Sequence, residues 1–116
     1  MSIFYKIEKA SAWQQAAEAG VYRGSALDLK DGYIHLSTAA QARETARLHF
    51  AGQTDLILAA MPESAVLADL KWEASRGGQL FPHVFSSLNP AGALWVKPLH
   101  WNGVTHDFPA EFHLCV

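Results

Sequence analysis

Tyr33-Ile34-His35-Leu36-Ser37-Thr38 is the stretch that decides the predicted fold, because it contains the passage from a strand into a helix. Tyr33 to Leu36 follows the turn-forming pair Asp31-Gly32 and is predicted to form a strand. Ser37 or Thr38 then caps a helix, and Gln41 follows Thr38 at the spacing of a capping box. A strand leading directly into a capped helix is therefore the centre of the predicted fold.

The neighbouring elements follow from hydrophobic periodicity and from the positions of glycine and proline. One helix is predicted to begin at the N-cap Ser11 and to end at Gly20, and another to run over residues 38–51. Residues 21–31 are predicted to form a loop with a short extended piece at 26–29. Further strands are expected at residues 3–7, 55–61, 66–73, 80–88 and 93–99. The pattern predicts an α+β fold in which 55–61 is a central strand covered on both faces.

Composition limits the class of protein. The 116 residues fit a single domain, 1–116, in which half of the residues are hydrophobic and 17% are charged. The net charge is -2 and the nine Lys and Arg residues are scattered, which disfavours long nucleic acid as a partner. No membrane span or signal peptide is predicted, and the single cysteine, Cys115, cannot form an intramolecular disulfide. We therefore expect a cytoplasmic protein, whose oligomeric state the sequence leaves open.

Alternation along the central stretch separates a polar face from an apolar face. A period of two places Tyr33, His35 and Ser37 on one side and Ile34 and Leu36 on the other. In one interpretation the polar side chains line the solvent side or satisfy local hydrogen bonds. In the other they form the floor of a cleft. The helix start that follows favours the cleft, because the free N–H groups at a helix N-terminus attract phosphates and carboxylates.

A second histidine, His83, lies among large apolar residues, where Pro82 indicates an edge strand or a bulge. His83 is either a hydrogen-bonded core or rim residue or a group on the opposite wall of the cleft. Glu73 and Arg76 lie upstream and are expected either to pair with each other or to face a ligand. Arg23 is a further donor for a terminal phosphate.

The C-terminal part of the chain invites a metal interpretation, which its spacing does not support. The residues concerned are His100, His106 and His113, with Asp107 and Glu111 nearby, and their separations match no compact zinc pattern. No metal site is predicted. The chain also lacks the common dinucleotide, phosphate-loop, serine-elbow and zinc-protease motifs.

Two segments carry a family resemblance. Residues 32–38 with Gln41, and then Leu80-Phe81-Pro82-His83-Val84-Phe85, resemble the signature stretches of domain-of-unknown-function family 952, a family of small bacterial proteins. The resemblance covers almost the whole chain, although Phe85-Ser86 stands where the family pattern has Tyr-Gly. That family is itself similar in fold to the ADP-ribosyltransferases and their RNA 2′-phosphotransferase branch. The resemblance implies a split, bent, mixed β-sheet with flanking helices.

The same resemblance implies roles for particular residues. In enzymes of that fold a histidine and a nearby Ser or Thr hold the ribose and the amide of NAD, and His35 and Ser37 match these positions. Leu36 stands where many of those enzymes carry glycine. Glu111 resembles the late glutamate that bonds a ribose hydroxyl. The implied activity is an NAD-dependent ADP-ribosyl or 2′-phospho transfer, with His35, His83 and Glu111 as catalytic residues.

Three hypotheses follow. The first is an ADP-ribosyltransferase-like domain that binds NAD or another small nucleotide-like molecule, with a ligand-binding set of Tyr33, Ser37, Thr38, Arg23, Glu73 and Arg76. The second is a non-catalytic module of the same fold that binds a small molecule or a partner. The third is an interaction protein without a ligand, for which the aromatic pair Trp95 and Trp101 is the indication.

Overall fold

The computed structural model describes residues 2–112, and its centre is the strand β3 (Leu56–Pro62). The strands β1 (Ile3–Lys9) and β6 (Trp95–Trp101) pair with β3 on either side, and β7 (His106–Asp107) extends the sheet beyond β6. Every residue of β3 is buried. This confirms the predicted central strand, because a strand without a solvated face is packed on both sides.

A second, smaller sheet contains the stretch that carries His35. Its strands β2 (Ile34–His35), β5 (Leu80–Val84) and β4 (Leu70–Ala74) lie in the order β2-β5-β4. The two sheets are joined where Tyr5 and Ser37 exchange backbone hydrogen bonds of 2.8 and 2.9 Å. The split sheet is therefore present, and the fold class is α+β.

The strand directions differ from the expectation of a mixed sheet. Every strand pair in the described residues is antiparallel. The pairs of β1 with β3 and of β2 with β5 join segments that are far apart in the sequence, so their relative direction depends on the path of the connecting chain and not on local propensity.

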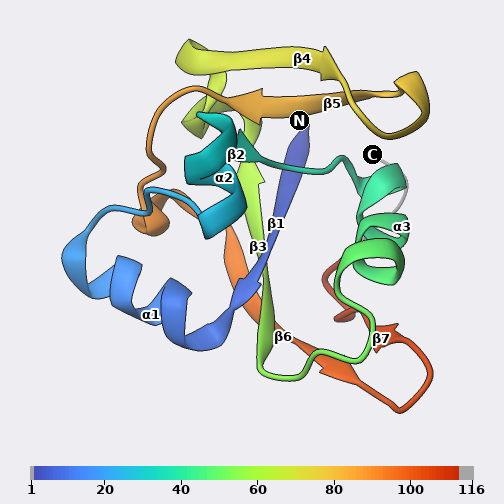
Figure 1. Ribbon diagram of the computed structural model, residues 1–116. Helices are drawn as coiled ribbons and strands as arrows, with labels where there is room; N and C mark the ends of the chain where they lie inside the picture. The colour runs from blue at the N-terminus through green and yellow to red at the C-terminus, as the bar shows by residue number, and fades with distance from the viewer. Residues whose placement is uncertain (1, 113–116) are drawn as a thin grey trace.

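Two apolar clusters lie on opposite faces of the large sheet. Trp13 and Ala16 of α1 (Ala10–Ala19) belong to one cluster, which also contains Ile34, Leu36 and Met61. Three alanines of α3 (Ala39–His49) belong to the other cluster. The β1 and β3 residues of that cluster alternate along each strand with those of the first cluster. Figure 1 shows α1 and α3 on opposite sides of β1 and β3. None of the described helices is long and apolar enough to cross a bilayer.

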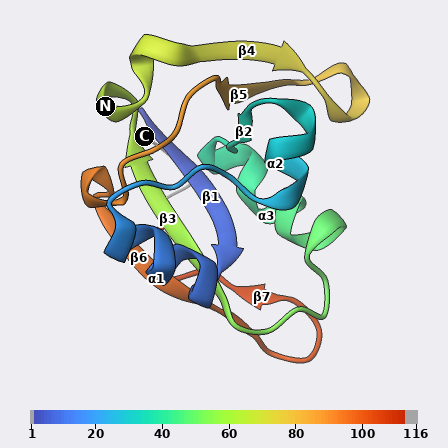
Figure 2. The same cartoon turned by 60° about the vertical axis from the view of Figure 1, so that its left-hand side comes forward.

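Residues 26–31 form a short helix, α2 (Ala26–Asp31), so the predicted extended piece at 26–29 is wrong. The Oγ atom of Ser25 accepts a hydrogen bond from the Asp28 N–H at 3.2 Å, and the Asp28 carboxylate accepts one from the Ser25 N–H at 2.9 Å. Gly32 ends the helix with φ 87°. Reciprocal capping stabilises this helix start, and Figure 2 shows the helix beside β2.

Other element boundaries move by a few residues. The helix α1 begins at Ala10 directly after β1, with Lys9 as its N-cap, so the predicted cap at Ser11 is wrong. The reason is tertiary, because the Ala10 N–H donates to the carbonyl of Asp55 at 2.7 Å. Strand β4 starts later than expected because 3₁₀ turns precede it; such turns span Glu63–Ala65, Leu67–Asp69, Arg76–Gly78 and Pro90–Gly92.

Candidate functional site

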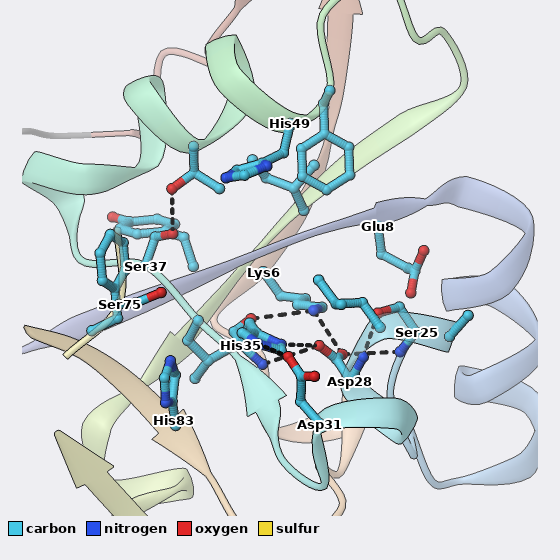
Figure 3. Close-up of a pocket in the computed structure, with 18 residues that line it drawn as sticks. Lys6, Glu8, Ser25, Asp28, Asp31, His35, Ser37, His49, Ser75 and His83 are labelled. Carbon is cyan, nitrogen blue, oxygen red and sulfur yellow. Dashed lines mark hydrogen bonds and ion pairs between the residues drawn. The ribbon is translucent and has the colours of Figure 1, made fainter. Parts of the chain in front are cut away.

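A cavity of about 550 Å³ lies where β1, α2, the end of β2, α3 and β5 meet. Figure 3 shows His35 and Asp28 near its middle, His83 and Ser75 toward one end, and Glu8 and Ser25 toward the other. Its volume falls within the range of about 300–1,000 Å³ that is usual for small-molecule sites. Histidine, carboxylate and hydroxyl groups line it together with the aromatic residues Tyr5, Phe50 and Phe81.

Two histidines face each other across the pairing of β2 with β5. His35 is the register partner of His83, and their ring centroids lie 5.2 Å apart at an interplanar angle of 70°. His83 is 1% exposed, and its Nδ1 atom lies 3.0 Å from the carboxylate of Glu73. Tyr33 stacks on the His83 ring at 4.2 Å. A carboxylate and an aromatic ring therefore hold His83 in one orientation.

The predicted alternation determines which side chains reach the cavity. Ile34 and Leu36 are each 2% exposed and belong to the apolar core, whereas His35 and Ser37 line the cavity. The alternation itself is thereby confirmed from Ile34 to Ser37. Leu36, which departs from glycine, also borders the cavity, although it belongs to the apolar core cluster.

Asp28 is the centre of a buried polar network. Its carboxylate accepts hydrogen bonds from Lys6 Nζ at 2.8 Å, from the His35 N–H at 3.2 Å and from the Ser25 N–H at 2.9 Å, and it lies 2.6 Å from His35 Nδ1. Burial by itself raises the pKa of this carboxyl. The bond with His35 and the charge of Lys6 outweigh burial and hold the pKa of Asp28 well below its usual range.

Gly24 allows the chain to pass close to this carboxylate. Gly24 has φ 116°, and a Cβ atom at that position would lie 2.6 Å from the Cβ atom of Asp28. Any larger residue would both strain the backbone and collide with the network. The close approach of Gly24 to Asp28 therefore helps to hold the Asp28 carboxylate against His35.

A second acid on α2 contacts the same histidine. Asp31 Oδ2 lies 3.0 Å from His35 Nε2, so the two ring nitrogens of His35 each face a carboxylate. The Asp31 side chain is 33% exposed, whereas that of Asp28 is 1% exposed. One carboxylate is enclosed by the protein and the other borders solvent.

The β1 wall supplies one cation and one further acid. Lys6 is 6% exposed and also donates to the His35 carbonyl at 3.2 Å. Glu8 accepts a hydrogen bond from the Tyr22 hydroxyl. Burial, and then this bond to Glu8, raises the pKa of Tyr22 far above its usual range. Among the described lining residues Lys6 is the one Lys or Arg, and it is already paired.

The α3 wall contributes weaker polar groups. Ser37 Oγ and Thr45 Oγ1 share a hydrogen bond of 3.0 Å, and His49 and Phe50 line the same side. Thr38 is not among the described lining residues, and its N–H donates to Gln41 Oε1 at 3.1 Å. The capping-box pattern of this helix is confirmed, and the Thr38 N–H is used within the protein.

The remaining residues predicted for the site lie elsewhere. Tyr33 and Arg23 line a separate cavity of about 190 Å³. Glu111 lies beside β6 of the large sheet, where its carboxylate is 3.7 Å from Lys97 Nζ, and it is not among the described lining residues. Arg76 lies in a 3₁₀ turn, and its side chain is outside the described part of the chain.

The C-terminal histidines do not come together in the described residues. Nε2 of His106 lies 2.9 Å from the carbonyl of Gln53, and His100 is exposed on β6. In residues 2–112 no group of three or more potential metal ligands gathers. His113 and Cys115 fall outside the described residues.

Sequence reasoning missed Lys6, Asp28 and Asp31. One pattern in the sequence was available for Asp28, because Ser25-x-x-Asp28 is a capping-box spacing of the kind recognised at Thr38. It predicts a helix start, but not that the same carboxylate reaches Lys6 and His35. Those contacts depend on the docking of α2 against β1 and β2.

Comparison with known proteins assigns the family. A family model described as a protein of unknown function, DUF952, matches residues 7–96. The chain belongs to the DUF952 family. The residues that line the cavity, except Tyr5 and Lys6, lie within the matched range. The comparison with curated proteins finds no match.

Solved structures of one relative, protein CC0527, have the same fold as this DUF952 chain. The crystal structure of protein CC0527 from Caulobacter crescentus is 40% identical, with a TM-score of 0.85, and the match covers 90% of this chain and 93% of that chain. The solution NMR structure of CC0527 is 42% identical, with a TM-score of 0.78 and 87% of each chain covered. The matches support the α+β architecture of the DUF952 family.

Proposed function

We propose that this DUF952 protein binds NAD or a related nucleotide in the cavity at His35 and His83 and acts as an ADP-ribosyltransferase-like enzyme. The observation that carries the proposal is the pair of facing histidines in a cavity of about 550 Å³, each held by a carboxylate. Perturbed and fixed titratable groups in a cavity are typical of binding and catalytic sites.

The charges of the cavity suggest which part of a nucleotide enters it. Glu8, Asp28 and Asp31 outnumber the single cation Lys6, which is already paired with Asp28. A pyrophosphate inside the cavity would face uncompensated like charge. A ribose with its attached base or nicotinamide instead offers hydroxyl and amide groups to the lining side chains. We therefore place the nucleoside end inside and the phosphates at the mouth.

The chemistry that such a ligand supplies is transfer of an ADP-ribosyl group away from nicotinamide. The protein's own contribution would be orientation and proton handling. His35 and Ser37 would hold the ribose and the amide. His83, whose Nδ1 atom contacts Glu73, would bond the ligand or move a proton.

A second function has one observation in its favour. Both ring nitrogens of His35 already contact carboxylates, so a ligand that uses His35 as an acid or base must first displace Asp31 from Nε2. This favours a non-catalytic module that binds a small molecule with the same residues.

Thermal unfolding with added ligands tests the binding step. The probes are NAD, ADP-ribose, nicotinamide and AMP, and a ligand at a hundred times its dissociation constant adds about 2.7 kcal/mol to the free energy of unfolding. We expect a raised melting temperature for wild type, a reduced shift for His83→Ala, and an unchanged shift for the exposed-histidine control His100→Ala. If none of the four probes stabilises wild type, the nucleotide proposal is wrong.

Release of nicotinamide separates the enzyme from the binding module. The measurement compares wild type with His35→Ala at saturating NAD. An enzyme releases nicotinamide in wild type and much less in the variant. Stabilisation by NAD without release in either protein supports the binding module and contradicts the transferase.

A further inference from the structure

Two carboxylates of one short helix contact opposite nitrogens of His35 but differ in how firmly they are held. Asp28 Oδ1 lies 2.6 Å from Nδ1, and Asp31 Oδ2 lies 3.0 Å from Nε2. Figure 3 shows His35 next to both Asp28 and Asp31. The Asp28 side chain is 1% exposed and that of Asp31 is 33% exposed, so the two contacts are made in different surroundings.

Asp28 has no freedom to leave His35. Its Oδ2 atom accepts from Lys6 and from the Ser25 N–H, while its Oδ1 atom accepts from the His35 N–H and faces the His35 ring. Close packing against Gly24 blocks movement from another side. Asp31, by contrast, is held among the described residues by one ion-pair contact, the one with His35.

We propose that Asp28 is the positioning residue of the site, which fixes the His35 ring with a proton on Nδ1 and leaves Nε2 as the nitrogen available to the cavity. A neutral imidazole donates through one nitrogen only. Nδ1 holds that proton, because an unprotonated Nδ1 would direct its lone pair at a buried carboxylate oxygen 2.6 Å away, where no water relieves the repulsion. Asp31 is then a solvent-side neighbour of Nε2 that does not determine the ring's state.

The proposal makes a specific prediction for Asp28→Asn. Lys6 and the Ser25 N–H both donate to Oδ2, whereas the longer bond from the His35 N–H is the one backbone donation to Oδ1, so the amide oxygen of the new side chain stays on the Lys6 side. The amide NH₂ then faces His35 Nδ1 and can only donate to it. Nδ1 must become an acceptor, and the ring proton moves to Nε2, next to Asp31.

The experiment is ¹⁵N NMR of the imidazole nitrogens in ligand-free protein under mildly alkaline conditions. We expect a protonated Nδ1 on His35 in wild type and in Asp31→Asn, and a protonated Nε2 in Asp28→Asn. The exposed His100 is the internal control and should give the same pattern in all three proteins. A merely structural role for Asp28 would lower stability without moving the proton.

Two results would overturn the proposal. One is an unprotonated Nδ1 on His35 in wild type, a result that stands even if Asp28→Asn does not fold. The other is an Asp31→Asn variant in which the His35 proton moves as it does in Asp28→Asn.

The orientation of His35 does not depend on the nucleotide proposal, although its use toward a ligand rests on it. If wild type binds NAD, Asp28→Asn should weaken that binding about tenfold or more, as is common for groups that orient a histidine, whereas the exposed control His100→Ala should keep it. Absence of NAD binding by wild type would refute the nucleotide proposal and leave the tautomer result to stand by itself.

Discussion

The large sheet and the region around α2 are both buried, but they achieve burial by different means. In the large sheet Leu58, Ala59, Ala60 and Met61 are 0% exposed and pack against apolar side chains from α1 and α3. Around α2 the buried groups are Lys6, Asp28 and His83, each with a polar partner. The first region stabilises the fold, and the second holds the side chains of the candidate site in place.

This difference has an energetic consequence. Apolar packing is non-directional, so the replacement of a core residue by another apolar residue of similar volume is tolerated. A buried ion pair contributes little net stability compared with apolar residues, but the loss of one partner leaves an uncompensated charge. The polar region should therefore be more sensitive to single substitutions than its size suggests.

The largest expected effect is that of Asp28→Ala. It leaves Lys6 buried without its counter-ion and removes the acceptor of the His35 N–H. We expect a loss of about 3–5 kcal/mol in the free energy of unfolding, measured by urea denaturation. The exposed acid Asp69 supplies the control, since Asp69→Ala should change the free energy by less than about 0.5 kcal/mol. Equal losses in the two variants would contradict the role of the network.

Leu58→Ala tests the apolar region at its centre. Leu58 lies on β3 and is 0% exposed, so truncation leaves a cavity in the core. We expect a loss of about 3 kcal/mol by urea denaturation, and Leu58→Met, which keeps the volume, should cost less than about 1.5 kcal/mol. The ¹⁵N pattern of His35 should not change. A moved His35 proton in Leu58→Ala would show that the two regions are not independent.

Gly24→Ala tests the close approach beneath Asp28. The new Cβ atom would combine a positive φ with a contact of 2.6 Å to the Asp28 Cβ atom. Gly103, with φ 98° and no atom within 4 Å of a built Cβ, is the matched control for the backbone strain alone. We expect a loss of about 2 kcal/mol for Gly24→Ala and less for Gly103→Ala. Equal losses in the free energy of unfolding for the two variants would mean that Asp28 moves aside for the new Cβ atom without destabilising the protein.

Acidification should produce the smallest effect over the accessible pH range. The pKa of Asp28 is lowered from its ordinary value of 3.8, so the unfolded chain binds a proton at higher pH than the folded protein does. The stability that this group contributes is complete well above pH 3.8 and is lost as the pH falls below that value. We expect wild type to lose stability more steeply than Asp28→Asn below about pH 4, measured by thermal unfolding in a pH series. If the stabilities of wild type and Asp28→Asn fall in parallel as the pH is lowered, the pKa of Asp28 is not lowered in the folded protein.

Much of the local structure could be predicted from the sequence. The apolar run of β3, the cap of α3 at Thr38 with Gln41, and the alternation from Ile34 to Ser37 all appear in the structure. Each depends on residues within a few positions of one another. The helix α2 was also within reach through Ser25 and Asp28, and was missed because its segment is short and polar.

The candidate site could be predicted only in part. His35, Ser37 and His83 line one cavity, whereas Tyr33 lines a separate one and Glu111 pairs with Lys97 of β6. A glutamate near the C-terminus can be recognised in a sequence. Its distance from a strand that lies 70 to 80 residues earlier depends on the fold, and local patterns carry no information about it.

The sequence by itself determined the faces of the central stretch, because period-two alternation is a property of the strand backbone. It also determined that His35 would leave the core while Ile34 and Leu36 entered it. The tertiary structure alone decided that His35 pairs with His83 and that Lys6 meets Asp28, which is 22 residues away. The physical reason is that a buried charge requires a partner, and chain folding, not spacing along the sequence, selects the partner it reaches.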